Sequence, residues 1–384
     1  MTPRIVIVGG GIVGTATAWQ LAAMGHASGV TVLERDLSLH AASTGRSTAG
    51  IRQQFSTPCN IRFSLYGLDF LRRLGLEAVG FRENGYLVLA GNDGAAGRMR
   101  RAHALQTAHG ADIVLLEPAA LAAAFPHLNT DDIALASFGR SGEGWFDSLA
   151  VQARLKAEAI AAGVVWQEAH AVGYRRRGDR VTGVRLADGT VLAADWVVNA
   201  AGARGAAMAA TADVAIPVEP RKRTAFAFTC QSSPEGRERL PLMIDSSLIW
   251  CRPEGPGFIV GRHPEPDPAV DPDDLEPRSL EFEEVIWPLL AARSPAFEAI
   301  RMTGLWAGHY AWCTHDQNAI IGPAPGCANL ILANGFSGHG VQHGPATGMV
   351  VAEFIIKGGS ETVDASEFSP ERLAVPVSAE THVW

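Results

Sequence analysis

The stretch "RIVIVGGGIVGTATAWQLAAMG", which begins at Arg4, constrains the fold more than any other part of the chain. Ile5–Val8 is a continuous run of β-branched residues, which is typical of a strand buried in a parallel sheet. Gly9, Gly11 and Gly14 follow with the spacing GxGxxG. In a strand–turn–helix unit, the first glycine permits the turn, the second lets the backbone approach a pyrophosphate, and the third lets helix and strand pack closely. The pattern therefore predicts a dinucleotide-binding unit.

A second predicted strand, "VTVLE" (30–34), ends at Glu34, twenty residues after Gly14. An acidic side chain at that distance accepts hydrogen bonds from the ribose of an adenosine and disfavours a 2′-phosphate. The predicted helix begins near Ile12 and Val13, and its N-terminus offers N–H groups and a positive dipole end to the diphosphate. These residues indicate an ADP-containing cofactor, without distinguishing a flavin from a nicotinamide.

The order of elements after Glu34 differs from that of a nicotinamide dehydrogenase, which normally continues with further βαβ units. A loop of small residues (40–55) and a helical stretch (60–75) follow instead. The next strands come much later. They are an antiparallel meander over 171–192, with Gly-Asp and Asp-Gly turns, and a buried strand in "DWVVNAAGAR" (195–204). The nucleotide-binding domain is therefore predicted to be assembled from separated segments.

A late segment, "NLILANGFSGHGVQHGPATG" (329–348), predicts one more buried strand that leads into a glycine-rich stretch. Because parallel sheets bind their ligands at the carboxyl ends of the strands, three loops should converge: 9–14, 200–202 and 335–344. A three-ring isoalloxazine needs contacts at both ends and over one face, whereas a nicotinamide has little use for a third such loop. We therefore favour FAD as the cofactor.

The fold class expected is α/β with two domains. One is a Rossmann-like FAD-binding domain assembled from discontinuous segments. The other is a substrate domain with a mainly antiparallel sheet, because "RTAFAFTC" (223–230) and "LIWCRPEGPGFIVG" (248–261) alternate apolar and polar residues. We assign residues 1–80, 145–210 and 326–384 to the FAD-binding domain, and residues 81–144 and 211–325 to the substrate domain.

Composition narrows the class of partner and the compartment. A net charge of -8 argues against a nucleic-acid partner, because phosphate binding needs a basic face. The basic runs 175–177 and 221–223 are expected to be solvated strand ends or hairpin edges. Five cysteines without a CxxC pair argue against both a disulfide framework and a zinc ribbon. Since no transmembrane run or signal peptide is predicted, we expect a cytoplasmic protein.

His339 and His343, spaced i, i+4, raise the alternative of a metal site, because such a pair on a helix can share a zinc ion. However, Gly340 stands where a zinc peptidase has its glutamate, and no third ligand is obvious. Pro345 also suggests a helix that begins only near that residue. We therefore predict no metal here, and instead a close approach of the backbone at Gly338 and Gly340 to a planar cofactor.

The chain resembles the D-amino acid oxidase superfamily of flavoproteins, which includes sarcosine oxidase and glycine oxidase, over nearly its whole length. The matching motifs are "GGGIVG", "STGRSTAGIR", "DWVVNAAGAR" and "GFSGHG". Within the superfamily it is most similar to FAD-dependent oxidoreductase domain proteins related to a mitochondrial complex I assembly factor. That similarity rests on "AGIRQQFSTPCNIRFS" (49–64), "WAGHYAWCTHDQNAIIGP" (306–323) and "GFSGHGVQHGPATG" (335–348). The resemblance implies non-covalent FAD, with the helix after GxSGHG facing the pyrimidine edge of the flavin.

The resemblance also implies roles for single residues. In sarcosine oxidases, the arginine that matches Arg52 binds the substrate carboxylate, and a histidine that matches His339 lies beside the flavin. Gln342 stands where that group has a lysine that helps to hold the carboxylate, and Ile259 where a second lysine promotes reaction with oxygen. Since a positive charge stabilises developing superoxide, the loss of these lysines favours a dehydrogenase over an oxidase. The candidate catalytic residues are Arg52, His339, Gln342 and Tyr310, the last from the matched re-entry to the FAD domain.

The expected FAD-binding residues lie on segments far apart in the chain. They are Gly9, Gly11, Ile12, Val13, Gly14, Glu34, Arg35, Ser43, Thr44, Ser47, Thr48, Gly50, Ile51, Val172, Ala201, Gly202, Gly308, Gly338, His339, Gly340, Val341 and Gln342. The expected reaction is oxidation of the C–N bond of a small amino acid or N-alkyl amino acid to an imine, with an electron-acceptor partner. The alternative is a flavin-binding assembly or interaction factor without turnover of its own.

Overall fold

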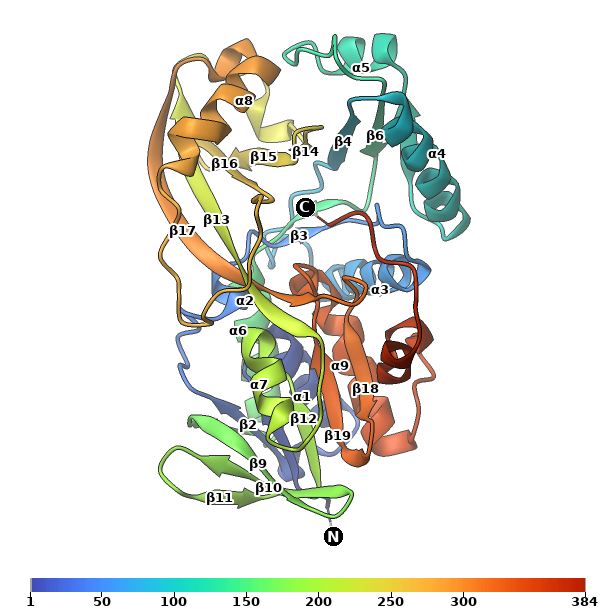
Figure 1. Cartoon of the computed structure of the whole chain (residues 1–384), viewed down its shortest axis with the longest axis vertical. Helices are drawn as coiled ribbons and strands as arrows, with labels where there is room; N and C mark the ends of the chain where they lie inside the picture. The colour runs from blue at the N-terminus through green and yellow to red at the C-terminus, as the bar shows by residue number, and fades with distance from the viewer. Residues whose placement is uncertain (1, 384) are drawn as a thin grey trace.

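The computed structural model describes residues 2–383 and contains two lobes, each built around a sheet (Figure 1). The lower lobe holds a six-stranded sheet with the order β18-β19-β12-β1-β2-β8. Neighbouring strands are parallel except for the antiparallel pair β18 and β19. The strands are β1 (Ile5–Val8), β2 (Val30–Glu34), β8 (Val165–Glu168), β12 (Trp196–Asn199), β18 (Ile320–Ala324) and β19 (Cys327–Asn334). This sheet confirms the Rossmann-like α/β fold and its assembly from separated segments.

Alternate residues of β1 bury themselves on opposite faces of this sheet, as the two-residue period of a strand requires. Ile5 and Ile7 join a core formed with helices, whereas Val6 and Val8 join a core formed with the meander. The helices are α1 (Ile12–Ala23), α3 (Pro58–Leu74), α6 (Ser148–Ala161) and α9 (Gly340–Lys357). The other face carries β9 (Ala171–Arg177), β10 (Arg180–Leu186), β11 (Val191–Ala193) and α7 (Gly205–Ala210). The predicted antiparallel meander is therefore confirmed.

The upper lobe holds an eight-stranded sheet with the order β17-β13-β16-β15-β14-β4-β6-β5. Its pairs are antiparallel except for β14 and β4, so the mainly antiparallel second sheet is confirmed. The strands are β4 (Tyr86–Ala90), β5 (Ile113–Leu116), β6 (Leu135–Gly139), β13 (Val218–Cys230), β14 (Leu242–Ile244), β15 (Ile249–Glu254), β16 (Gly257–Arg262) and β17 (Ile300–Cys313). Its helices are α4 (Asp93–Ala108), α5 (Pro118–Ala124) and α8 (Trp287–Arg293).

The loop of small residues (40–55) joins the two lobes. It contains a short helix, α2 (Ser43–Arg46), and a short strand, β3 (Gly50–Ile51), which pairs with β7 (Gly144–Trp145). The predicted helical stretch after this loop is α3. Because β18 pairs within the six-stranded sheet, we propose that the last FAD-domain segment begins before residue 320 rather than at 326.

Two predictions from the sequence are wrong. The helix after the glycine-rich stretch begins at Gly340, not near Pro345, because the His343 N–H already donates to the carbonyl of His339 at 3.1 Å. Pro345 therefore lies inside α9. The run 221–223 is not a solvated edge: it lies within β13, and Lys222 is buried because it forms an ion pair with Asp274.

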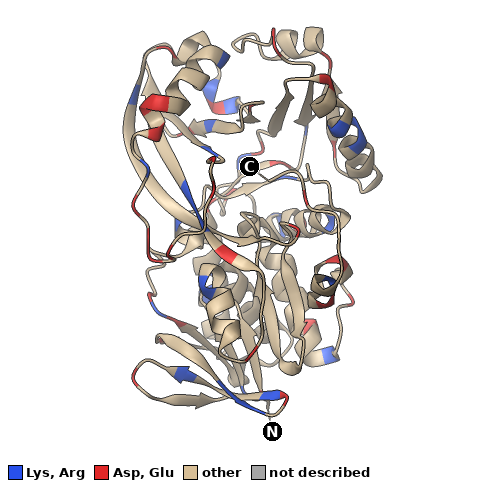
Figure 2. Cartoon of the chain, in the orientation of Figure 1, with Lys and Arg blue, Asp and Glu red and all other residues tan. Residues whose placement is uncertain are grey.

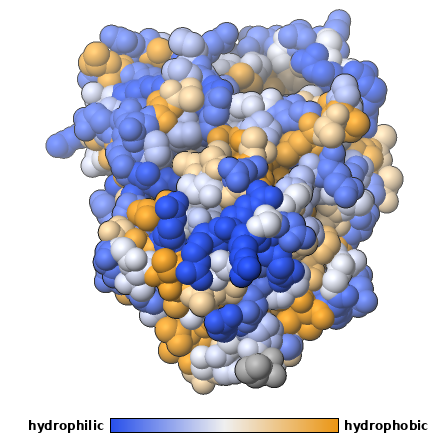
Figure 3. Space-filling view, turned by 60° about the horizontal axis from the view of Figure 1, so that its bottom comes forward, coloured by the Kyte–Doolittle hydropathy of each residue, from blue (hydrophilic) through white to orange (hydrophobic). Residues whose placement is uncertain are grey.

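Charged residues of both signs are spread over the two lobes (Figure 2). The face that Figure 3 brings forward mixes hydrophilic and hydrophobic residues. Among the described residues, none of the helices is both long enough and apolar enough to span a membrane.

Candidate active site

A cavity of about 530 Å³ lies at the carboxyl ends of β1, β2 and β12, and both lobes contribute to its walls. It brings together all four candidate catalytic residues. It also brings together every expected FAD-binding residue except Gly14 and Ile51. Gly14 acts by packing, because a Cβ atom there would lie 1.9 Å from the carbonyl oxygen of Gly9. The Ile51 side chain is fully buried in the helical core.

One end of the cavity is formed by the glycine-rich turn and the end of β2. Gly9 has a φ of +110°, and a Cβ atom there would lie 2.3 Å from the carbonyl oxygen of Ala200, so no other residue fits without displacing the backbone. The Glu34 carboxylate accepts a hydrogen bond from the Gly10 N–H at 2.8 Å. This contact fixes the acidic side chain beside the turn, at the position expected for a ribose-binding group.

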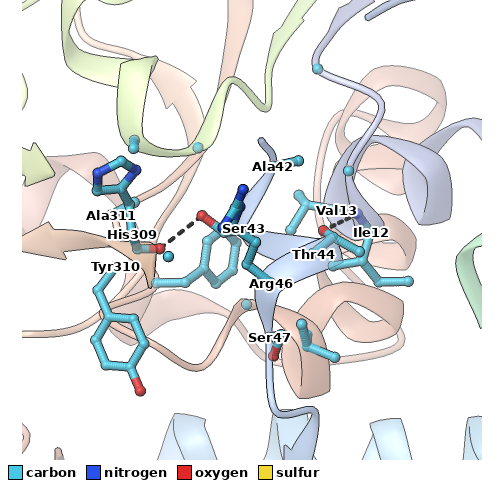
Figure 4. Close-up of a pocket in the computed structure, with 18 of the residues that line it drawn as sticks. Ile12, Val13, Ala42, Ser43, Thr44, Arg46, Ser47, His309, Tyr310 and Ala311 are labelled. Carbon is cyan, nitrogen blue, oxygen red and sulfur yellow. Dashed lines mark hydrogen bonds between the residues drawn. The ribbon is translucent and has the colours of Figure 1, made fainter. Parts of the chain in front are cut away.

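The loop that contains α2 passes along the middle of the cavity (Figure 4). The Thr44 hydroxyl accepts from the Ile12 N–H at 3.0 Å and so caps one of the free donors at the start of α1. The Ser43 hydroxyl donates to the carbonyl of His309 at 2.7 Å, which ties the loop to β17 of the other lobe. Arg46 makes a second such tie, to the carbonyl of Ala307 at 2.9 Å.

The opposite end of the cavity is formed by the N-terminus of α9. Gly338 has a φ of +97°, and a Cβ atom there would lie 2.5 Å from the ring of Tyr310. The chain therefore needs glycine at this point to bring the start of the helix against the cavity. Gly340, Val341 and Gln342 form the first turn, whose N–H groups have no partner within the helix and carry the positive end of its dipole.

Arg52 lies at this same end and is only 4% exposed. Its guanidinium donates to the backbone carbonyls of Gln54 and His382, the latter at 2.5 Å, and stacks 3.8 Å from the ring centroid of Phe55. Burial lowers the pKa of Arg52. The surrounding carbonyls and the aromatic face still favour the cation, so a buried positive charge borders the cavity.

His339 and His343 are both buried and adjacent to Phe55. Burial and the charge of Arg52 hold the pKa of His339 well below its usual value, and the same causes lower the pKa of His343 to about 3. Both imidazoles are therefore neutral near pH 7. His343 Nε2 lies 3.0 Å from the Ser64 hydroxyl. No group of three or more His, Cys, Asp or Glu suited to a metal ion occurs between residues 2 and 383.

Gln342 and Tyr310 take up different positions around Arg52. The Gln342 side-chain oxygen accepts from the Arg52 backbone N–H at 2.9 Å and from the Ser64 hydroxyl at 3.3 Å. Gln342 thus connects α9 to β3 and α3, in the place where a lysine was considered from the resemblance. Tyr310 lines the cavity from β17, and the guanidinium of Arg223 lies 4.8 Å from the centroid of its ring.

Residues that the sequence did not single out also line the cavity. They are chiefly Arg46, His170, Arg204, Met208 and Pro272. Arg46 lies inside the loop that was expected to contact the cofactor, and Arg204 follows the predicted convergence point at 200–202, so both could have been found by extending those segments. Pro272 enters from the long connection after β16, and nothing in its local sequence indicated this position.

A family model described as FAD dependent oxidoreductase (DAO) matches residues 4–354. The chain belongs to this family. It is 37% identical over 413 residues to FAD-dependent oxidoreductase domain-containing protein 1 of Xenopus laevis, covering 96% of this chain and 82% of that protein. It is 25% identical to mitochondrial sarcosine dehydrogenase of Mus musculus, covering 94% of this chain and 40% of that protein. The crystal structure of L-proline dehydrogenase from P. horikoshii superposes with a TM-score of 0.85 at 27% identity, covering 97% of this chain and 98% of that one.

FAD is the cofactor of this family, and the cavity of this flavoprotein fits it. The end with Gly9, Gly11 and Glu34 has the glycine turn and the acidic side chain that an ADP moiety requires. The end with Gly338 and Gly340 has a side-chain-free backbone and a helix N-terminus, which suit the polar edge of a flat ring. The two ends belong to one continuous cavity, as a long dinucleotide needs.

Proposed function

We propose that the protein oxidises the C–N bond of a small amino acid or N-alkyl amino acid to an imine, which water then hydrolyses. The observation that carries the proposal is the Arg52 guanidinium, which is buried and borders the cavity beside the N-terminus of α9. A guanidinium binds a carboxylate through two parallel N–H···O bonds and so fixes the orientation of an amino-acid substrate. The printed names of two similar proteins, a sarcosine dehydrogenase and an L-proline dehydrogenase, describe oxidation of such compounds.

The residues of the chain supply orientation and electrostatics. When bound, FAD accepts the two electrons and the hydrogen that leave the substrate carbon. Arg52 holds the carboxylate, while Tyr86, Trp250 and Tyr310 enclose the bound molecule and exclude water. The first turn of α9 presents N–H groups that stabilise negative charge at the ring end of the cavity, and so favour reduction.

We favour a dehydrogenase over an oxidase because the cavity lacks an evident uncompensated cation on the substrate-lobe sheet. Ile259, at the position considered for the oxygen-promoting lysine, is buried in β16 and does not line the cavity. Arg223 does line it, but forms two parallel hydrogen bonds with Asp267, of 2.7 and 2.9 Å. The opposite charges of this pair largely cancel at a distance, which weakens any stabilisation of developing superoxide. An acceptor other than oxygen is then needed.

A second candidate function is a flavin-binding assembly or interaction factor. It is favoured by the printed name of the relative that shares 37% identity, because "domain-containing protein" names no reaction. This function requires FAD binding but no turnover. The cytoplasmic location and the absence of a nucleic-acid partner remain predictions from the sequence.

Anaerobic titration of the FAD-loaded protein with a panel of amino acids and N-methyl amino acids tests the proposal. Loss of the visible flavin absorbance with at least one of them is the expected result, and D and L forms of each compound would assign chirality. The same compounds without the carboxylate serve as controls, since they lack the group that Arg52 binds. A flavin that no compound in the panel bleaches would favour the assembly factor.

A further inference from the structure

Residues 375–383, which we name the C-terminal strap, run from the lower lobe to the cavity between the lobes. In Figure 1 the end of this segment, labelled C, lies close to β3. Most of the strap is exposed, but Glu380 is only 2% exposed. An exposed segment with one deeply buried carboxylate has a single strong anchor, so the contacts of Glu380 decide where the strap lies.

The anchor of the strap is the N-terminus of α3. The Glu380 carboxylate accepts hydrogen bonds from the backbone N–H groups of Ser56 and Thr57, both at 2.9 Å, and from the Ser56 hydroxyl at 2.6 Å. The Asn60 amide adds a further donor at 2.9 Å. Donors at the start of a helix, together with the positive end of its dipole, hold a carboxylate strongly.

The strap then reaches Arg52. The carbonyl of His382, two residues beyond the anchor, accepts from the Arg52 guanidinium at 2.5 Å. The Thr381 N–H donates to the Ser56 hydroxyl at 2.9 Å, so the backbone between the anchor and His382 is also fixed. Since the Gln54 carbonyl accepts from the other terminal nitrogen of Arg52, the guanidinium is oriented from two sides, and the strap supplies one of them.

We propose that Glu380 is a positioning residue: by anchoring the strap to α3, it places the His382 carbonyl so that the Arg52 guanidinium is preorganised for a substrate carboxylate. The inference rests on the proposed function. A planar, bidentate contact depends on the orientation of the guanidinium, and a flexible arginine must lose rotamer freedom to make it. Glu380 lies outside the cavity wall and acts only through the strap.

The competing explanation is that Glu380 merely stabilises α3. Glu353 provides a matched control, because it is also a buried carboxylate that binds two backbone N–H groups and a hydroxyl. It accepts from Glu361 N–H at 2.9 Å, Thr362 N–H at 3.0 Å and the Thr362 hydroxyl at 2.6 Å, and it does not line the cavity. Glu380→Gln and Glu353→Gln should therefore both reduce stability, but only the first should affect Arg52.

The test compares wild type, Glu380→Gln and Glu353→Gln, all loaded with FAD, by binding of acetate, followed as a perturbation of the flavin spectrum. We expect Glu380→Gln to weaken acetate binding about tenfold, and to raise KM for an amino-acid substrate with little change in kcat, because preorganisation acts on binding. Glu380→Asp, which retains the charge, should recover part of the affinity. Equal acetate affinity in wild type and Glu380→Gln would overturn the inference.

A second measurement reads the guanidinium without any substrate. Phenylglyoxal modifies accessible arginines, and mass spectrometry of the peptide that contains Arg52 gives its rate of modification. This rate should rise several-fold in Glu380→Gln and stay unchanged in Glu353→Gln. If wild type binds neither acetate nor any amino acid, the proposed function fails, and the modification rate alone then decides the inference. An unchanged rate in Glu380→Gln would refute it.

Discussion

A terminal nitrogen of Arg52 lies 3.3 Å from Nε2 of His339, although 287 residues separate them in the chain. Because the guanidinium can only donate, Nε2 must accept, and the proton of the neutral imidazole is on Nδ1. His339 thereby supports Arg52 without competing for charge. A neutral histidine with a strongly lowered pKa is a poor proton acceptor, which agrees with a site that works by orientation.

Arg52→Ala should raise KM for a carboxylate-bearing substrate by roughly 10- to 100-fold, the loss expected for a hydrogen bond to a charged group. Arg52→Lys should fall between wild type and alanine, because it keeps the charge but lacks the planar fork. Steady-state kinetics check both variants. An amine substrate without a carboxylate should be affected far less. Equal losses for both substrates would place Arg52 in a structural role.

Asp267→Asn should increase the rate at which oxygen reoxidises the reduced protein by about tenfold, because it leaves the charge of Arg223 uncompensated beside the cavity. Stopped-flow mixing of the reduced protein with aerated buffer measures this rate. Asp132→Asn, which breaks the ion pair with Arg293 away from the cavity, serves as the control and should have no effect. If Asp267→Asn does not speed reoxidation, the ion pair does not explain slow reaction with oxygen.

The stability of the protein should fall between pH 5 and pH 8 because of Glu143. Burial raises the pKa of this carboxyl to about 7, even though Gln53 N–H and the Gln54 amide donate to it at 2.6 and 2.8 Å. The unfolded chain ionises near pH 4.5, so the folded state alone keeps the proton above that pH. The contribution of Glu143 is therefore complete below pH 4.5 and is lost as pH rises through about 7, by up to about 3 kcal/mol.

Denaturant titrations of wild type and Glu143→Gln at both pH values check this dependence. The glutamine variant cannot ionise, so its free energy of unfolding should change less between the two pH values. The same change in both proteins would show that other groups govern the pH dependence.

Gly338→Ala should reduce both thermal stability and FAD retention, because the added methyl group would meet the ring of Tyr310 at a positive φ. We expect a loss of about 2 kcal/mol or more. Gly178→Ala is the matched control: its φ is also positive, +62°, but no atom lies within 4 Å of the added Cβ. Calorimetry and the ratio of flavin to protein absorbance separate the two variants. Equal behaviour would mean that backbone strain alone, and not contact at the cavity, sets the effect.

Local sequence was enough to predict the parts of the site that local chemistry determines. The turn at Gly9, the strand that ends at Glu34 and the meander are formed by short segments with strong turn and strand preferences, and all were predicted. The resemblance added Arg52 and His339, whose proximity no local pattern contains.

Long-range pairing explains what the sequence did not reveal. The run 221–223 resembled a solvated edge until its partners, Asp267 and Asp274, were seen in a connection some 40 to 50 positions later. Glu380 and Ser56 are separated by 324 positions, so their contact left no spacing to detect. The start of α9 was misjudged because Pro345 is usually found in the first turn, whereas here the preceding turn is already formed.

The strand order of the six-stranded sheet also bears on the synthesis of the protein. β1 and β2 emerge from the ribosome first, yet β12 pairs with β19, which is translated only after the strands of the other lobe. The nascent chain thus carries an open sheet edge until nearly the whole polypeptide has been made. Capture of the flavin is consequently a late event, and ribosome-bound fragments that stop short of α9 should remain colourless.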